Sequence, residues 1–142
     1  MADTFTQFSC SLDVGSAEHA TTALDLLAAM QEGDDDEPIY GLEVAVDPVN
    51  PGTLFLSDGD GFGDPEHVIA FVLRCAEVFD LKGRWGFTWS LTCSKPRLDG
   101  FGGGAQLLDL GQRKSLAWTD CEHWLAAVLD PATDPDEGVV FA

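Results

Sequence analysis

The first half of this chain lacks bases entirely. Residues 1–73 hold 15 Asp and Glu residues and no Lys or Arg, and all seven bases of the 142-residue chain lie between Arg74 and Lys114. The net charge is −18, of which −15 belongs to residues 1–73 and −3 to residues 74–142. A negative field of this size repels phosphate, so it argues against direct binding of nucleic acid or of an anionic membrane.

Other features are also missing. No apolar run approaches the roughly 20 residues that span a bilayer, and the start of the chain lacks the basic and apolar stretches of a signal peptide. The cysteines form no CxxC pair and stand far apart, at Cys10, Cys75, Cys93 and Cys121. We therefore expect a cytoplasmic protein with reduced, mostly buried thiols.

The composition nevertheless supports a folded core. Hydrophobic residues make up 45% of the chain, which is typical of a globular protein and argues against disorder despite the charge. The length favours one domain. We place this domain at residues 1–131, followed by a loosely held tail at residues 132–142.

Residue periodicity and helix caps predict the order of the elements. Alternating apolar residues indicate strands, Ser16 and Asp64 are typical N-caps, and Pro65 suits a first helical position. The predicted elements are a strand at 6–14, a helix at 17–31, strands at 42–46 and 53–57, a helix at 65–80, a strand at 85–91, a hairpin of 105–110 with 116–118, and a helix at 121–129. This order predicts an α+β fold with a mainly antiparallel sheet, two long helices on one face, and a ferredoxin-like βαββαβ core with an extra C-terminal ββα.

The apolar stripes of these elements predict which side chains are buried. On the second helix we expect Val78 and Phe79 to face the core, and on the last helix Trp124, Leu125 and Val128. The aromatic strand would be a stacking platform in a basic protein that binds single strands. With this charge, we interpret its Trp85, Phe87 and Trp89 as core.

Three segments match part of the sequence motif of a known ligand site but lack the remaining residues of that motif. A calcium loop beginning at Asp58 would need ligands where Phe62 and Ile69 stand. The run Gly100–Ala105 matches G-x-G-x-x-A but leads into a strand where the dinucleotide motif needs a helix. The Cys121–His123 segment has no second ligand pair at finger spacing. We interpret these segments as a solvated turn, closely packed backbone and ordinary helix residues, and we expect no cofactor or metal.

A cationic loop follows the aromatic strand. Its candidate anion pocket consists of Cys93, Ser94, Lys95 and Arg97. Cations near a thiol favour the thiolate, and such a loop can hold an anion. A nucleophilic Cys93 would also need a base, which the fold would have to supply from His19, His67 or His123. A small enzyme or anion-binding domain built on this loop is therefore the alternative function.

The acidic residues themselves form the main candidate surface. Glu18, Asp25 and Glu32 are seven residues apart, which places them in one stripe along the first helix. The sequence prolongs this stripe with Asp34, Asp35, Asp36 and Glu37. No cation in this half offsets the repulsion. The stripe is either a solubilising face or a partner-binding surface that occupies a basic, nucleic-acid-binding groove.

A pattern in the second half resembles known sequences. Trp85-Gly86-Phe87-x-Trp89, Cys93-Ser94-Lys95-Pro96-Arg97 and Phe101-Gly102-Gly103-Gly104-Ala105 together resemble a pattern in small uncharacterised proteins of bacterial plasmids and phages. The resemblance covers most of residues 5–129. That group has no established activity, so the resemblance implies a mobile-element context and no catalytic residues.

Charge and context together predict the function. We expect a non-enzymatic acidic protein that blocks a basic, nucleic-acid-binding surface of a partner protein. By analogy of size and charge, such a protein would be a phage or mobile-element inhibitor of host defence, for example an anti-CRISPR or anti-restriction DNA mimic.

Overall fold

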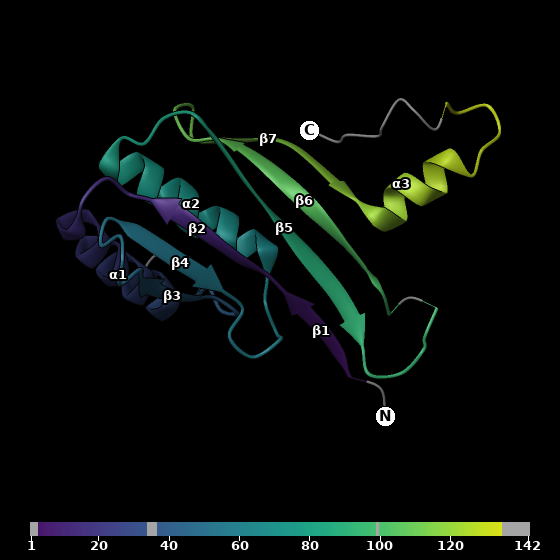
Figure 1. Cartoon of the computed structure of the whole chain (residues 1–142), viewed down its shortest axis with the longest axis horizontal. Coiled ribbons are helices and arrows are strands. Elements are labelled where there is room, and N and C mark those ends of the chain that lie inside the picture. Colours follow the sequence, from purple (N-terminus) through teal and green to yellow (C-terminus); the bar gives the residue numbers. More distant parts are fainter. Residues whose placement is uncertain (1–2, 34–36, 99, 135–142) are drawn as a thin grey trace.

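The chain folds into two antiparallel sheets and three helices. The structure is a computed structural model that describes residues 3–33, 37–98 and 100–134. The first sheet has the strand order β2-β4-β3, and the second sheet has the order β1-β5-β6-β7 (Figure 1). The strands are β1 (Thr4–Gln7), β2 (Ser9–Asp13), β3 (Glu43–Val46), β4 (Thr53–Ser57), β5 (Arg84–Cys93), β6 (Gly102–Asp109) and β7 (Lys114–Asp120). The helices are α1 (Ala17–Glu32), α2 (Pro65–Phe79) and α3 (Cys121–Val128).

The predicted fold class is confirmed. β2 and β3 each pair antiparallel with β4, and β5 pairs antiparallel with β1. Because β1 runs directly into β2, the lateral order is β5, then β1 with β2, then β4, then β3, which is the order of a ferredoxin-like core. β6, β7 and α3 extend this core at the C-terminal side.

The predicted strand at 6–14 is wrong as one strand, because it divides at Phe8 between the two sheets. The loop after β4 holds this division in place. The two carboxylate oxygens of Asp58 accept hydrogen bonds from the backbone N–H groups of Phe8 at 3.0 Å and Gly61 at 2.7 Å. The N–H of Thr6 also donates to the carbonyl of Gly61 at 2.7 Å. The loop that resembles part of a calcium site therefore holds the point at which the chain passes from one sheet to the other.

The core lies under the two long helices. Leu12 on β2 and Leu54 and Leu56 on β4 are buried on one sheet face, while Phe55 on the opposite face is 48% exposed. α1 packs against α2, β3 and β4, so the helices cover the apolar face as predicted. Val78 of α2 is 42% exposed, which corrects the expectation that it is buried.

Both long helices begin at the predicted caps. The hydroxyl of Ser16 accepts a hydrogen bond from the N–H of His19, and Asp64 accepts one from the N–H of Glu66. α2 ends at Asp80, which adopts a left-handed conformation with φ of 53°. Each cap satisfies a backbone group that the helix itself leaves without a partner.

Arg113 connects the end of α2 to the turn between β6 and β7. Its guanidinium donates to the carbonyls of Leu81, Leu110 and Gly111, and it pairs with Asp80 at 2.8 Å. The hydrogen bond from Arg113, with further attraction from Lys82, holds the pKa of the Asp80 carboxyl below its ordinary value. This junction joins the helical layer to the second sheet.

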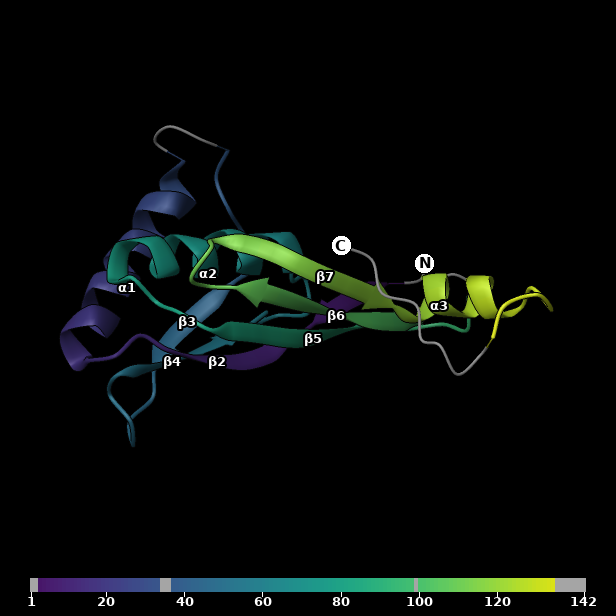
Figure 2. The same cartoon turned by 90° about the horizontal axis from the view of Figure 1, so that it is seen from above.

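α3 lies at the opposite end of the elongated molecule from α1 (Figure 2). Its predicted bounds are nearly correct, but Trp124 is 40% exposed and Leu125 is 50% exposed. The expectation that these side chains are buried is wrong: among the described residues, the main contacts of α3 are with β6 and β7, and they leave both side chains exposed.

No helix formed by the described residues has the length and apolar character needed to cross a membrane.

Candidate functional site

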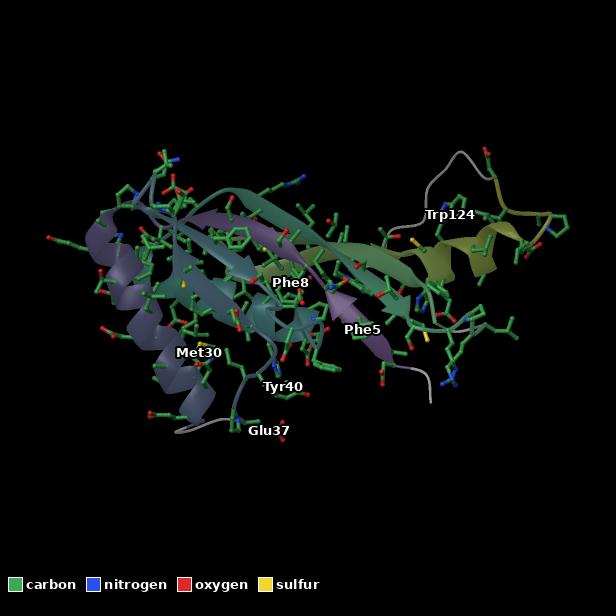
Figure 3. The ribbon with its side chains drawn as sticks, turned by 60° about the horizontal axis from the view of Figure 1, so that its bottom comes forward. Phe5, Phe8, Met30, Glu37, Tyr40 and Trp124 are labelled. Carbon is green, nitrogen blue, oxygen red and sulfur yellow. The ribbon has the colours of Figure 1, made fainter. Side chains whose placement is uncertain are left out.

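The acidic stripe of α1 faces solvent. Glu18, Asp25 and Glu32 are all exposed, and successive members are about 10.5 Å apart along the helix axis, since each residue adds about 1.5 Å. Their carboxylates have no hydrogen-bond or ion-pair partner among the described residues. Glu37, also exposed, lies beside the C-terminal end of α1 (Figure 3). Asp34, Asp35 and Asp36 lie outside the described residues.

Most of the described aspartates outside α1 in the same half have a structural role instead. Besides Asp58 and Asp64, three of them accept hydrogen bonds from backbone N–H groups in turns: Asp13, Asp47 and Asp60. Such bonds satisfy the backbone N–H groups of the turns. They account for the presence of these aspartates without any need for a binding partner. The stripe has no comparable explanation, so the structure separates structural acids from acids that are available for binding.

The bases do not neutralise the stripe. Arg74 pairs with Glu77 on its own helix, and Lys82 and Arg113 both approach Asp80. Among the described residues, no acid before Arg74 forms an ion pair with Lys or Arg. The charge asymmetry of the sequence is therefore retained in space.

The cationic loop is exposed and lies far along the second sheet from α1 (Figure 1). Lys95 and Arg97 are exposed, and Ser94 pairs with Asp3 through a backbone bond and a side-chain bond, both of 2.8 Å. Cys93 is half-buried against Gly100, where an added Cβ would lie 2.6 Å from the Cβ of Cys93. These contacts anchor the loop to the N-terminal end of β1.

The histidines have partners elsewhere. His19 bonds to the carbonyl of Val14, His67 bonds to backbone atoms of Tyr40, and His123 pairs with Asp120 at 2.6 Å. The structure thus brings Lys95 and Arg97 into one loop but shows no histidine bonded to Cys93 within the described residues. The anion pocket stays a prediction.

The other thiols differ in reactivity. Burial raises the pKa of the Cys75 thiol to about 12 and that of Cys10 to about 11, so both stay protonated and unreactive at neutral pH. Cys121 is exposed on α3. Across the described residues, no group of three His, Cys, Asp or Glu side chains is placed to hold a metal ion.

The glycine run has a packing explanation. Gly103 and Gly104 lie within β6, which leads through a turn into β7 and not into a helix. The indole of Trp89 lies against Gly104, where an added Cβ would come within 2.8 Å of the ring atom Cζ2. The resemblance to a dinucleotide motif therefore reflects an aromatic ring packed on bare backbone.

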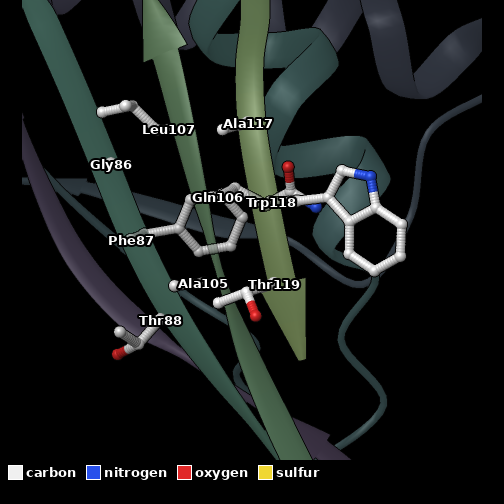
Figure 4. A pocket seen from close by; sticks show the side chains of 9 residues that line it. All are labelled: Gly86, Phe87, Thr88, Ala105, Gln106, Leu107, Ala117, Trp118 and Thr119. Atoms are coloured by element: carbon white, nitrogen blue, oxygen red, sulfur yellow. The ribbon is translucent and has the colours of Figure 1, made fainter. Parts of the chain in front are cut away.

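The two faces of the second sheet each contain a hollow. On the outer face, small and apolar side chains of β5, β6 and β7 line a shallow depression of about 460 Å³ (Figure 4). On the inner face, a second hollow of about 510 Å³ lies between the first turn of α2 and the strands. We call this second one the inner hollow. Sequence reasoning missed it, because its walls meet only through strand register and the placement of α2.

Comparison with protein-family models, curated proteins and solved structures gives no match to this chain.

Proposed function

We propose that this protein is a non-enzymatic binding protein that presents the acidic face of α1 to a basic surface of a partner protein. The supporting observation is that Glu18, Asp25 and Glu32 are exposed and that their carboxylates have no hydrogen-bond or ion-pair partner among the described residues. Exposed carboxylates without a local counter-charge add to the negative field of the chain, and this field attracts a cationic partner. The partner of this proposal is a cytosolic nucleic-acid-binding protein, such as a host-defence nuclease.

The spacing of the stripe defines the kind of mimicry. One carboxylate per about 10.5 Å of helix is sparser than one strand of DNA, which places a phosphate about every 3.4 Å. The stripe alone therefore does not reproduce phosphates one for one. In this proposal the carboxylates of α1 contact separate basic groups of the partner surface, and Glu37 and the neighbouring aspartates in the sequence extend this acidic face.

The experiment compares two triple variants of equal charge and equal composition. The stripe variant Glu18→Gln, Asp25→Asn and Glu32→Gln changes the net charge from −18 to −15, and so does the control Asp3→Asn, Glu43→Gln and Glu122→Gln. All six positions are exposed. The partner is first isolated by cross-linking in bacterial lysate, purified, and then titrated at several salt concentrations.

The stripe variant should bind the purified partner at least about tenfold more weakly, because tenfold corresponds to only about 1.4 kcal/mol spread over three charges. The control should bind almost like the unaltered protein. Affinity should fall steeply with salt, and duplex nucleic acid should compete. Equal losses in both variants, or an affinity that salt does not change, would show that the stripe is only a solubilising face.

A further inference from the structure

The inner hollow is built by two neighbouring cross-strand rows. Strand register places Phe87, Gln106 and Trp118 in one row, and Trp89, Gly104 and Asp120 in the next. Because Gly104 has no side chain, the indole of Trp89 covers its backbone. This floor is therefore aromatic on two sides, from Trp89 and Trp118.

α2 provides the opposite wall. Its first turn contributes Glu66, and the next turn contributes Ile69. Glu66 and Asp120 therefore line the same hollow, and none of the nine lining residues is a base. Asp120 is held in place, because one carboxylate oxygen accepts from the backbone N–H of His123 at 2.7 Å, the other lies 2.6 Å from Nδ1 of the His123 ring, and the side chain is only 15% exposed.

Trp89 adds a second, independent observation. Its indole nitrogen is buried and has no hydrogen-bond partner among the described residues. A buried donor without an acceptor is unfavourable. A carbonyl oxygen of a bound chain would remove this penalty if a shift of the indole brought its N–H within reach.

We propose that the inner hollow binds an arginine or lysine side chain of a protein segment. The cation lies against the indole faces and between the two carboxylates, and a backbone carbonyl of the same segment accepts from Trp89. Cations are attracted by indole faces and, in a molecule of this net charge, by the whole field. This inference rests on the proposed function, since it makes the hollow the place where one basic residue of the partner docks.

The test uses a small probe and no partner protein. Acetyl-Gly-Arg-Gly-amide is titrated into the full chain while the four indole N–H signals are followed by nuclear magnetic resonance. The neutral isostere with citrulline in place of arginine is the matched ligand. We expect the signals of Trp89 and Trp118 to move with the arginine peptide and to move far less with the citrulline peptide.

Two variants give the protein-side control. Glu66 and Glu43 are both exposed acids in the same half of the chain. Glu66→Gln and Glu43→Gln therefore remove the same charge by the same substitution, but only Glu66 lines the hollow. Glu66→Gln should weaken binding by about tenfold, as expected for loss of a charged hydrogen bond, and Glu43→Gln by less than about twofold.

Ser115→Lys supplies a further check, because Ser115 is exposed and lines the hollow. An ammonium group there should abolish binding of the peptide without removing a wall of the site. Equal affinity for the citrulline peptide, equal weakening by Glu43→Gln, or shifts confined to Trp85 and Trp124 would each overturn the proposal. Such a failure would leave the α1 proposal standing, because that proposal is tested by the stripe variant and the purified partner.

Discussion

The buried core and the exposed candidate surfaces are distributed unequally between two regions of this protein. Of the 18 buried hydrophobic residues in the described part of the chain, 15 lie between Phe8 and Ala76, and the remaining three are Phe87, Leu108 and Leu110. The first region, residues 8–79, therefore holds almost the whole core and also most of the negative charge. The second region, residues 84–128, holds both hollows on its sheet and the exposed apolar residues of α3.

This difference indicates how the molecule tolerates its charge. Burial of large apolar side chains contributes on the order of 1.5–3 kcal/mol each, whereas each surface charge contact is worth at most about 1 kcal/mol. A region with a well-packed core can therefore carry a repulsive outer face. The second region has fewer buried residues, so its thin sheet is better suited to contacting a ligand than to stabilising the fold.

The largest expected effect tests where the stability resides. Phe71 of α2 is fully buried, while Phe101 before β6 is 58% exposed. Phe71→Ala should lower the free energy of unfolding by about 3–5 kcal/mol, because it removes a large buried ring and leaves a cavity. Phe101→Ala should change it by less than about 0.5 kcal/mol. Urea denaturation, monitored by circular dichroism, measures the free energy of unfolding of both variants. Similar decreases in the two variants would refute the division into two unequal regions.

The same comparison explains which parts of the fold sequence reasoning could predict. Ser16, Asp64 and Pro65 act within a few residues of their own position, so local patterns located both long helices. The division at Phe8 depends on Asp58, which is 50 residues away, and no local pattern contains it. Alternation continues across the division, so the segment reads as one strand.

Burial at the end of the chain could not be read from periodicity. The stripe on α3 is amphipathic, but an apolar stripe does not say whether another element covers it. Trp124 and Leu125 are exposed because the main contacts of α3 among the described residues, with β6 and β7, do not cover them. For the candidate sites, the sequence predicted the exposed stripe on α1, whereas the inner hollow depends on the register of β5, β6 and β7 and was missed.

An intermediate effect tests the packing of the second sheet. Gly102→Ala should be nearly neutral, because no atom lies within 4 Å of the added Cβ. Gly104→Ala should lower the free energy of unfolding by about 1–3 kcal/mol, since its Cβ would contact the Trp89 ring and the carbonyl of Thr119. Thermal unfolding and the near-ultraviolet circular dichroism of the tryptophans provide the measurements. Equal behaviour of the two variants would mean that Trp89 does not depend on bare backbone beneath it.

The smallest expected effect tests whether a carboxylate of the acidic stripe is present although it lowers the stability of the fold. Glu18 lies in the first turn of α1, where a negative charge is favoured by the helix dipole, and Glu32 lies at the last helical position, where it is disfavoured. Glu18→Gln should therefore lower the free energy of unfolding and Glu32→Gln should raise it, each by about 0.3–1 kcal/mol at low salt. The last turn of α1 contains no base, so the unfavourable charge of Glu32 has no local compensation.

Urea denaturation at low and high salt should show changes of opposite sign in the free energy of unfolding for the two variants, and smaller changes at high salt. If Glu32→Gln were neutral or destabilising, Glu32 would need no function to explain it. A gain in stability together with a loss of partner binding would indicate that this carboxylate is kept for binding and not for folding.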